Sequence, residues 1–98
     1  MHKVLVLYNH PANAQAFRDY YEKNHVPLAQ KLPGLLSAQY TFSVQGLGAD
    51  SPYFCVWEGM FESEAAMGAA VTSAEGQAVV ADIPNYATGG VVILHYDV

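Results

Sequence analysis

The fold is decided by one stretch in the middle of the chain, Tyr53-Phe54-Cys55-Val56-Trp57-Glu58-Gly59-Met60-Phe61. Aromatic and β-branched residues dominate it, which is typical of a strand. Because successive side chains of a strand point to opposite faces, both faces here are apolar: Tyr53, Cys55 and Trp57 on one, and Phe54, Val56 and Met60 on the other. The pattern predicts a strand inside a sheet that is buried on both faces.

Three other segments have strand character. Residues His2 to Asn9 and Gly89 to Tyr96 are also apolar on both faces. Residues Leu36 to Gln45 alternate between apolar and polar without exception, which predicts one apolar and one polar face. The glycine-rich segment from Gly46 to Pro52 is then a loop.

Two helical regions separate these strands. Asn13 is a suitable N-cap for a helix from Ala14 to about Lys31, and the proline in His25-Val26-Pro27 predicts a kink or break inside it. Ser63 can cap a helix over Glu64 to Val71. Thr72 and Glu75 have capping-box spacing for a further helical segment that ends before Pro84.

The resulting order, β-α-β-β-α-β, predicts an α+β fold of the ferredoxin-like type in a single domain over residues 1–98. Such a fold has a four-stranded antiparallel sheet with its helices on one face. The other face would leave a larger apolar patch exposed than monomers usually carry. We expect a second copy of the chain to cover it, so that two sheets form a dimeric α/β barrel. The alternative is that long loops cover this face.

The amino-acid composition limits which classes of partner and which cellular compartment are expected for this protein. Charged residues make up 13% of the chain, against about 25% in typical soluble domains, and the net charge is −5. Four basic residues are too few for a nucleic-acid footprint or an anionic membrane surface, so neither partner is expected. No apolar run has transmembrane length, the N-terminus lacks a signal peptide, and the single cysteine, Cys55, allows no internal disulfide. These features favour a cytoplasmic homodimer.

His25 is the first candidate for chemistry, as a proton-transfer group. A helix interrupted at Pro27 frees backbone carbonyls and can turn an imidazole towards a cavity. An imidazole with an ordinary pKa suits general acid/base catalysis. The equally strong structural interpretation is that His25 only caps those carbonyls.

Aromatic residues could form the walls of a small-molecule site, with Phe17, Tyr21, Tyr40 and Trp57 as the candidate substrate-binding residues. For any one of them, ordinary core packing is the more economical interpretation. Glu58 interrupts an apolar strand and could be an acid or base, although a rim position or a pair with Lys3 is favoured.

Metal and nucleotide sites are not expected. The four histidines form no HxH or HxxxH pair, and no Cys/His cluster exists. Cys55 lies on an apolar strand and is expected to be a core residue rather than a nucleophile. Because the chain also lacks a glycine-rich phosphate loop, the sequence implies no cofactor.

Two stretches resemble the family named for the EthD protein of ethyl tert-butyl ether degradation. They are residues 17–34, FRDYYEKNHVPLAQKLPG, and residues 73–86, SAEGQAVVADIPNY. The resemblance covers the whole chain in order and length, and the His-x-Pro-Leu and Leu-Pro-Gly motifs are its most specific part. It implies the dimeric α/β-barrel fold. It draws attention to His25 with its neighbours Tyr21 and Pro27, and to Asp82 as a further substrate-binding candidate.

The resemblance implies less about activity. The founding member accompanies an ether-oxidising cytochrome P450 system. Similar proteins in polyketide pathways are associated with dehydration, decarboxylation or oxidation of aromatic intermediates. The sequence therefore leads to one main hypothesis, a homodimer that binds an apolar or aromatic metabolite and carries out cofactor-free acid/base chemistry with His25. Two alternatives remain open: a non-catalytic ligand carrier or accessory to a monooxygenase system, and a purely structural dimer without a pocket.

Overall fold

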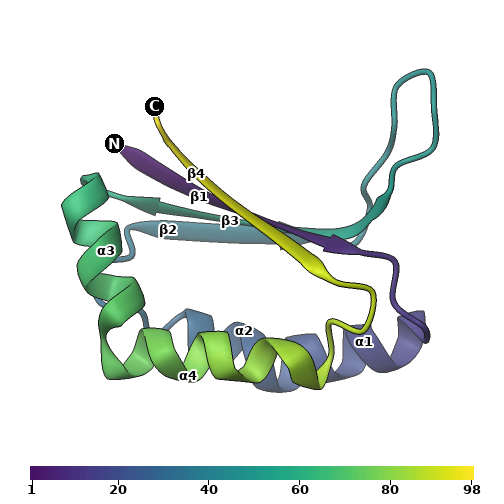
Figure 1. Ribbon diagram of the computed structural model, residues 1–98, viewed down its shortest axis with the longest axis horizontal. Helices are drawn as coiled ribbons and strands as arrows, with labels where there is room; N and C mark the ends of the chain where they lie inside the picture. The colour runs from purple at the N-terminus through teal and green to yellow at the C-terminus, as the bar shows by residue number, and fades with distance from the viewer.

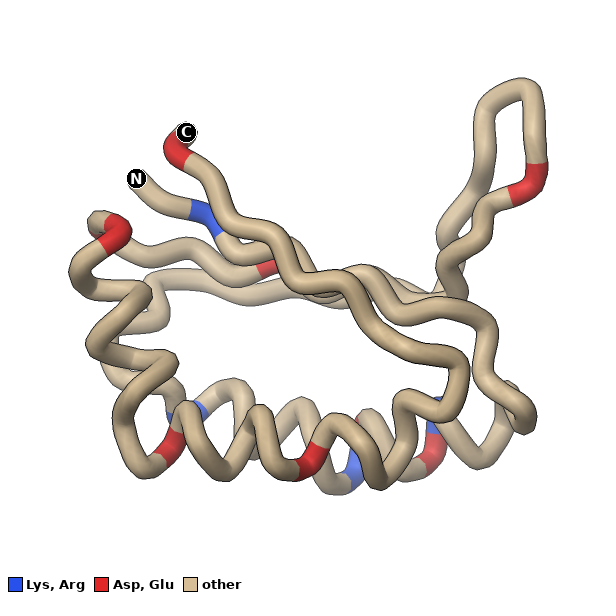
Figure 2. Tube along the Cα trace, in the orientation of Figure 1, with Lys and Arg blue, Asp and Glu red and all other residues tan.

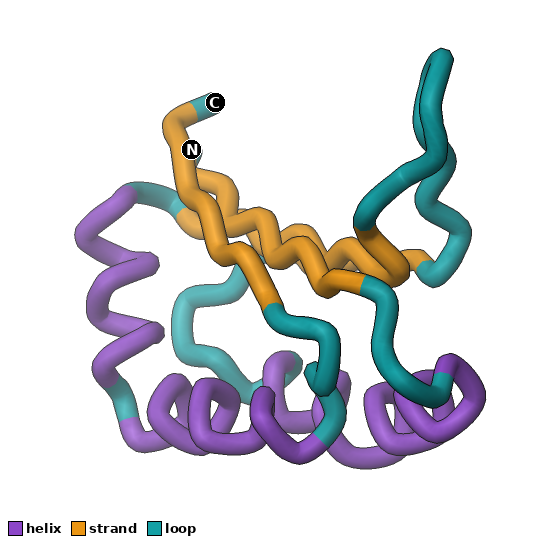
Figure 3. Tube along the Cα trace, turned by 45° about the vertical axis from the view of Figure 1, so that its right-hand side comes forward, coloured by secondary structure: helices purple, strands orange, loops and turns teal.

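The computed structural model describes residues 1–98 as a sheet layer packed on a helix layer (Figure 1). The strands are β1 (His2–Asn9), β2 (Ser37–Thr41), β3 (Tyr53–Phe61) and β4 (Val91–Asp97). They pair antiparallel in the order β2-β3-β1-β4. All helices lie on one side of this sheet (Figure 3). The predicted α+β, ferredoxin-like fold is confirmed.

The helix layer consists of two segments, each made of consecutive short helices. The first contains α1 (Ala14–Tyr20), the π-helical turn η1 (Tyr21–His25) and α2 (Val26–Ala29). The second contains α3 (Glu64–Thr72), α4 (Ala74–Asp82) and the 3-10 turn η2 (Ile83–Asn85). Asn13 and Ser63 cap α1 and α3 as predicted, whereas α4 is capped by Ser73 rather than Thr72.

The predicted interruption near Pro27 is a π-helical turn and not a break. The Val26 amide donates to the Tyr21 carbonyl, five residues back. Proline has no amide hydrogen, and its ring clashes with the carbonyl four residues earlier in a regular α-helix. The wider π turn accommodates Pro27 without ending the helix. π turns of this kind are frequent at functional sites.

Two strand predictions need correction. The second strand covers only Ser37–Thr41, because its pairing with β3 ends there and the chain then leaves the sheet as a projecting loop (Figure 1). Phe54 was expected on the face opposite Cys55. An irregularity in the β1–β3 register skips Phe54, and its ring packs against Phe17 on the helix side, 5.0 Å between centroids.

An aromatic cluster fills the helix side of the sheet near α1. Phe17, at 2% exposed, packs against four aromatic rings with centroid distances of 5.0–5.4 Å: Tyr8, Tyr21, Phe54 and Tyr86. Tyr21 is fully buried in the same cluster. These contacts fix α1 and the π turn against the sheet, so that the next buried residue, His25, is also held in place.

The helix-free face of the sheet remains largely open. Residues that alternate away from the helices on β4 are exposed by 39–48%: Val92, Leu94 and Tyr96. Two charged residues on this face, Lys3 and Glu58, pair with each other at 3.4 Å. Figure 2 shows few other charged positions along the strands. The loop between β2 and β3 projects away from it instead of covering it (Figures 1 and 3). None of the helices combines the length and apolar character needed to cross a membrane.

We expect the Phe17→Ala variant to lose about 3–5 kcal/mol of unfolding free energy, because it removes a buried ring from a tightly packed cluster. Urea unfolding followed by circular dichroism measures this loss. Leu36→Ala is the matched control, since Leu36 is 55% exposed and its truncation should cost under about 1 kcal/mol. Equal losses in the two variants would contradict the assigned core.

Candidate active site

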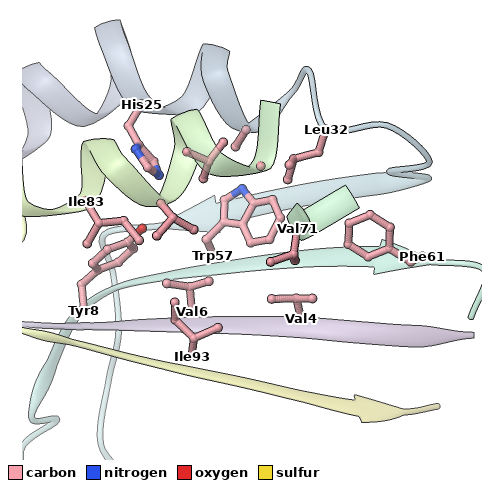
Figure 4. A pocket seen from close by; sticks show the side chains of 14 residues that line it. Val4, Val6, Tyr8, His25, Leu32, Trp57, Phe61, Val71, Ile83 and Ile93 are labelled. Atoms are coloured by element: carbon pink, nitrogen blue, oxygen red, sulfur yellow. The ribbon is translucent and has the colours of Figure 1, made fainter. Parts of the chain in front are cut away.

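A cavity of about 120 Å³ lies between the sheet and the helices, beside α4. Twelve of its fourteen lining residues are hydrophobic, and the two others are Gly76 and His25. Figure 4 shows Trp57 and Val6 rising from the sheet while His25 and Ile83 approach from the helices. An apolar cavity of about 150 Å³ accommodates a benzene ring. This space therefore suits the ring of a small molecule.

Trp57 forms the floor of the cavity because its neighbour on the strand has no side chain. A Cβ atom on Gly59 would lie 2.3 Å from Cη2 of the Trp57 indole, far inside van der Waals contact. Glycine at this position lets the indole lie flat along the sheet. The cavity above the indole depends on that arrangement.

His25 is held by a buried carboxylate. Its Nδ1 lies 2.9 Å from Oδ2 of Asp82, at the end of α4, and the two residues are 3% and 9% exposed. Tyr20 and Asn85 donate to the other carboxylate oxygen, Oδ1, at 2.6 and 3.0 Å. Asp82 thus accepts three hydrogen bonds, which is how a buried charge becomes tolerable.

These contacts shift both pKa values. Burial lowers the pKa of His25 below its ordinary 6.5, and the hydrogen bond to Asp82 only partly offsets this. Burial would raise the pKa of Asp82, but the hydrogen bonds from Tyr20, Asn85 and His25 outweigh it and lower the pKa. At neutral pH the pair is therefore an uncharged imidazole beside an ionised carboxylate.

The pair fixes the tautomer of His25. A carboxylate can only accept, so Nδ1 carries the proton and Nε2 keeps its lone pair. The hydrogen bond of the His25 side chain uses Nδ1 alone, so Nε2 has no partner within the chain, and His25 lines the cavity. A basic nitrogen that faces an apolar cavity and is oriented by a carboxylate is the arrangement of a general base. The alternative that His25 caps free carbonyls is wrong, because its partner is Asp82.

Two tyrosines close the cavity behind His25. Tyr8 lines the cavity, and its hydroxyl lies 2.7 Å from that of Tyr86, whose ring packs 4.6 Å from the imidazole. Burial raises the pKa of Tyr8 to about 12, so its hydroxyl keeps its proton at neutral pH. The two tyrosines thus contribute uncharged hydroxyl groups to this side of the site.

The other predicted binding residues are distributed unevenly around this cavity. Trp57 lines it together with His25, and Asp82 stands behind His25 as its partner. Phe17 and Tyr21 lie in the adjacent aromatic cluster, where the Tyr21 ring stacks on His25. Tyr40 lines a separate surface pocket with Trp57, and its hydroxyl donates to Glu22 at 2.6 Å.

Sequence reasoning missed Tyr8 and the aliphatic walls, and it did not connect Tyr20 with Asp82. The alternation that places Val4, Val6 and Tyr8 on one face of the strand was the available signal for Tyr8 and the aliphatic walls. No local pattern could reveal the Tyr20–Asp82 contact, since the two residues are 62 positions apart.

Two residues outside the cavity, Glu58 and Cys55, have the structural roles that the sequence favoured: an ion pair and a core position. Glu58 binds Lys3 at 3.4 Å and Gln39 at 2.7 Å on the helix-free face. Cys55 is fully buried, and burial raises the pKa of its thiol to about 12. Neither arrangement favours a catalytic role.

Comparison with known proteins gives the family of this chain. Residues 9–90 match the EthD domain. The chain belongs to the EthD family. A Rhodococcus erythropolis protein is 38% identical over 99% of this chain and 94% of its own length. It is described as an uncharacterised 11.0 kDa protein of the thcB-thcC intergenic region.

Solved structures agree on the fold. An EthD family protein from Bacillus halodurans has a TM-score of 0.92 at 26% identity and covers 100% of this chain and 98% of its own. A dimeric ferredoxin-like protein of unknown function from Jannaschia sp. has a TM-score of 0.73 at 17% identity, covering 99% and 98%. The hydroxynitrile lyase of Passiflora edulis has a TM-score of 0.78 at 15% identity, covering 99% and 92%.

The His25–Asp82 pair predicts a defined pH response. We expect the NMR titration of His25 to have its midpoint below 6.5, and Asp82→Asn to lower it further, because the variant removes the negative partner. Asp19→Asn, at an exposed aspartate of α1, is the control and should leave the midpoint unchanged. A higher midpoint in Asp82→Asn would contradict the assigned pair.

The same shift links stability to pH. Because the folded-state pKa of His25 lies below the unfolded value of about 6.5, the unfolded chain takes up the proton first as pH falls. The unfolding free energy should therefore decline as pH drops below about 6.5, until the folded-state pKa is reached. Urea unfolding of His25→Gln between pH 7 and 5 should show a weaker decline than the parent protein.

Proposed function

We propose that this EthD family protein binds a small apolar or aromatic metabolite in the cavity beside Trp57 and removes a proton from it with His25. One observation carries the proposal: the basic Nε2 atom of a buried, carboxylate-oriented imidazole faces a cavity that is otherwise almost wholly apolar. The reaction class is cofactor-independent acid/base chemistry, as in an isomerase, a dehydratase or another lyase. We also propose a cytoplasmic location for the protein, which its single cysteine supports.

The surroundings of His25 support a base more than an acid. A neutral imidazole has an available lone pair, and the walls around it are almost wholly apolar. The Asp82 carboxylate stabilises the imidazolium that forms when Nε2 takes up a proton. Tyr8, being protonated, can donate a hydrogen bond to a ligand oxygen but cannot compete as a base.

The working unit in this proposal is a homodimer that buries the helix-free face. Leu5 and Leu94 are cross-strand partners on that face, and Leu94 is 48% exposed in the single chain. Burying large side chains of this kind contributes roughly 1.5–3 kcal/mol each. The Jannaschia protein of the same fold is described as dimeric.

Base chemistry can be tested without knowing the natural substrate. In 5-nitrobenzisoxazole, a base removes the ring C–H proton while the N–O bond breaks, and the electron pair moves to oxygen to give a coloured nitrophenolate. We expect catalysis by the parent protein, and a fall in kcat/KM of about 100-fold or more in His25→Ala. His10→Ala, which changes an exposed histidine, is the matched control and should keep full activity.

The binding step has its own readout, because Trp57 is the single tryptophan and lines the cavity. Saturable quenching of its fluorescence without turnover would contradict proton transfer and favour the ligand carrier or monooxygenase accessory. If the probe caused no quenching and no turnover, that result would contradict the cavity as a binding site.

The dimer proposal predicts a change of mass in one variant. We expect Leu94→Asp to convert a dimer into a monomer, because it places a charge in the centre of an apolar interface. Size-exclusion chromatography with light scattering measures this. Ala78→Asp, on an exposed position of α4, should remain dimeric. A monomeric parent protein, or an unchanged Leu94→Asp dimer, would contradict the proposal.

A further inference from the structure

A second hydrogen-bonded chain of side chains lies where β1 begins beside the end of β4, near the two termini (Figure 1). Nδ1 of His2 lies 2.6 Å from Oδ1 of Asp97, and Nε2 of His2 lies 2.8 Å from Nδ1 of His95. His2 is only 3% exposed, whereas His95 and Asp97 are exposed. Because both His2 nitrogens are engaged, this is a polar relay and not a metal site.

When both imidazoles are neutral, the hydrogen bonds of this relay can run in one direction only. An ionised carboxylate only accepts, so Nδ1 of His2 donates to Asp97. In a neutral His2 ring the other nitrogen then accepts, which requires Nδ1 of His95 to donate. The Nε2 atom of a neutral His95 is left as a hydrogen-bond acceptor. His95 is thereby oriented in the same way as His25, through its Nδ1 atom.

His95 stands next to the cavity and on the same face of the sheet. Its cross-strand partner is Val4, and Ile93 lies two residues before it on β4. Both of these residues line the cavity, as Figure 4 shows from close by. Side chains two apart on a strand share a face, and cross-strand Cβ atoms are about 5 Å apart. The side chain of His95 therefore begins beside two residues of the cavity wall, Val4 and Ile93.

This side of the cavity is also its open side. Three lining residues are about half exposed: Val71 at 46%, Val80 at 52% and Ile93 at 49%. They come from α3, α4 and β4, so the opening lies between those helices and the edge strand. A ligand whose ring lies beside His25 would extend its other end past Ile93, towards His95.

We propose that His95 is a specificity-determining residue that accepts a hydrogen bond from a hydroxyl group at the outer end of the ligand. The inference rests on the proposed function, since it assumes a ligand ring beside His25. It narrows the ligand class to a small ring compound with a hydroxyl-bearing tail. His2 and Asp97 are positioning residues, because they act on the ligand only through His95.

Two matched probes test this assignment. Tyrosol and 4-propylphenol share a phenol ring and a tail of equal length, and differ only in a terminal hydroxyl in place of a methyl group. Quenching of Trp57 measures both affinities. We expect His95→Ala to weaken tyrosol binding by about 3- to 10-fold, the effect of one lost hydrogen bond, and to change 4-propylphenol by less than about 2-fold. His10→Ala should alter neither affinity.

The outcomes separate this inference from the proposed function. Equal changes for the two probes, or none for tyrosol, would overturn the role of His95. If 4-propylphenol still bound in a His25-dependent way, the proposed function would stand. Failure of both probes to bind the parent protein would contradict both proposals.

The relay has a separate readout. In the parent protein, ¹⁵N NMR should detect the His95 tautomer with hydrogen on Nδ1. Asp97→Asn should shift that tautomer and weaken tyrosol selectively. An unchanged tautomer in this variant would overturn the positioning role of Asp97.

Discussion

The hydrogen bond between His25 and Asp82 is the constraint on which the rest of the site depends. It joins the π turn of the first helical segment to the end of α4, and it is nearly inaccessible to water. Without it, the imidazole would have no fixed tautomer, and Asp82 would be a buried charge with one partner fewer. This hydrogen bond therefore fixes the position of the π turn against the end of α4, and it also determines which nitrogen of His25 faces the cavity.

The sheet supplies the second constraint. Its helix side is filled with aromatic rings near α1, whereas the region beside α4 has aliphatic walls and the flat indole of Trp57. Glycine at position 59 makes room for the indole, so the cavity depends on the absence of a side chain at that position of β3. The opposite face is largely uncovered by its own chain, and the proposed homodimer would bury it.

Much of the fold could be predicted from periodicity, because a strand such as Tyr53–Phe61 or His2–Asn9 is defined by local alternation. The errors arose where local pattern and pairing disagree. Phe42 and Val44 continue the alternation of β2, but β3 offers them no partner. Phe54 changed faces because of a register irregularity that no sequence pattern marks. Pro27 indicated an irregular helix, though not its π-helical form.

The site was also predictable only where a local sequence signal marked it. His25 was recognisable because Pro27 disturbs the helix beside it. Its partnership with Asp82 joins residues 57 positions apart and depends on tertiary packing. Phe17 and Tyr21 were interpreted as possible cavity walls, and they lie instead in the cluster that supports the π turn. The relay from Asp97 to His95 joins the two ends of the chain, where neither end has any local motif.

The most direct measurement of the central claim is a crystal structure of the protein soaked with 4-propylphenol. The account predicts electron density for the ring above the Trp57 indole, with the phenol oxygen at hydrogen-bond distance, about 2.8 Å, from Nε2 of His25. His25 should keep its bond to Asp82 in that complex. A ligand bound elsewhere, or an imidazole turned so that Nε2 leaves the cavity, would contradict the account.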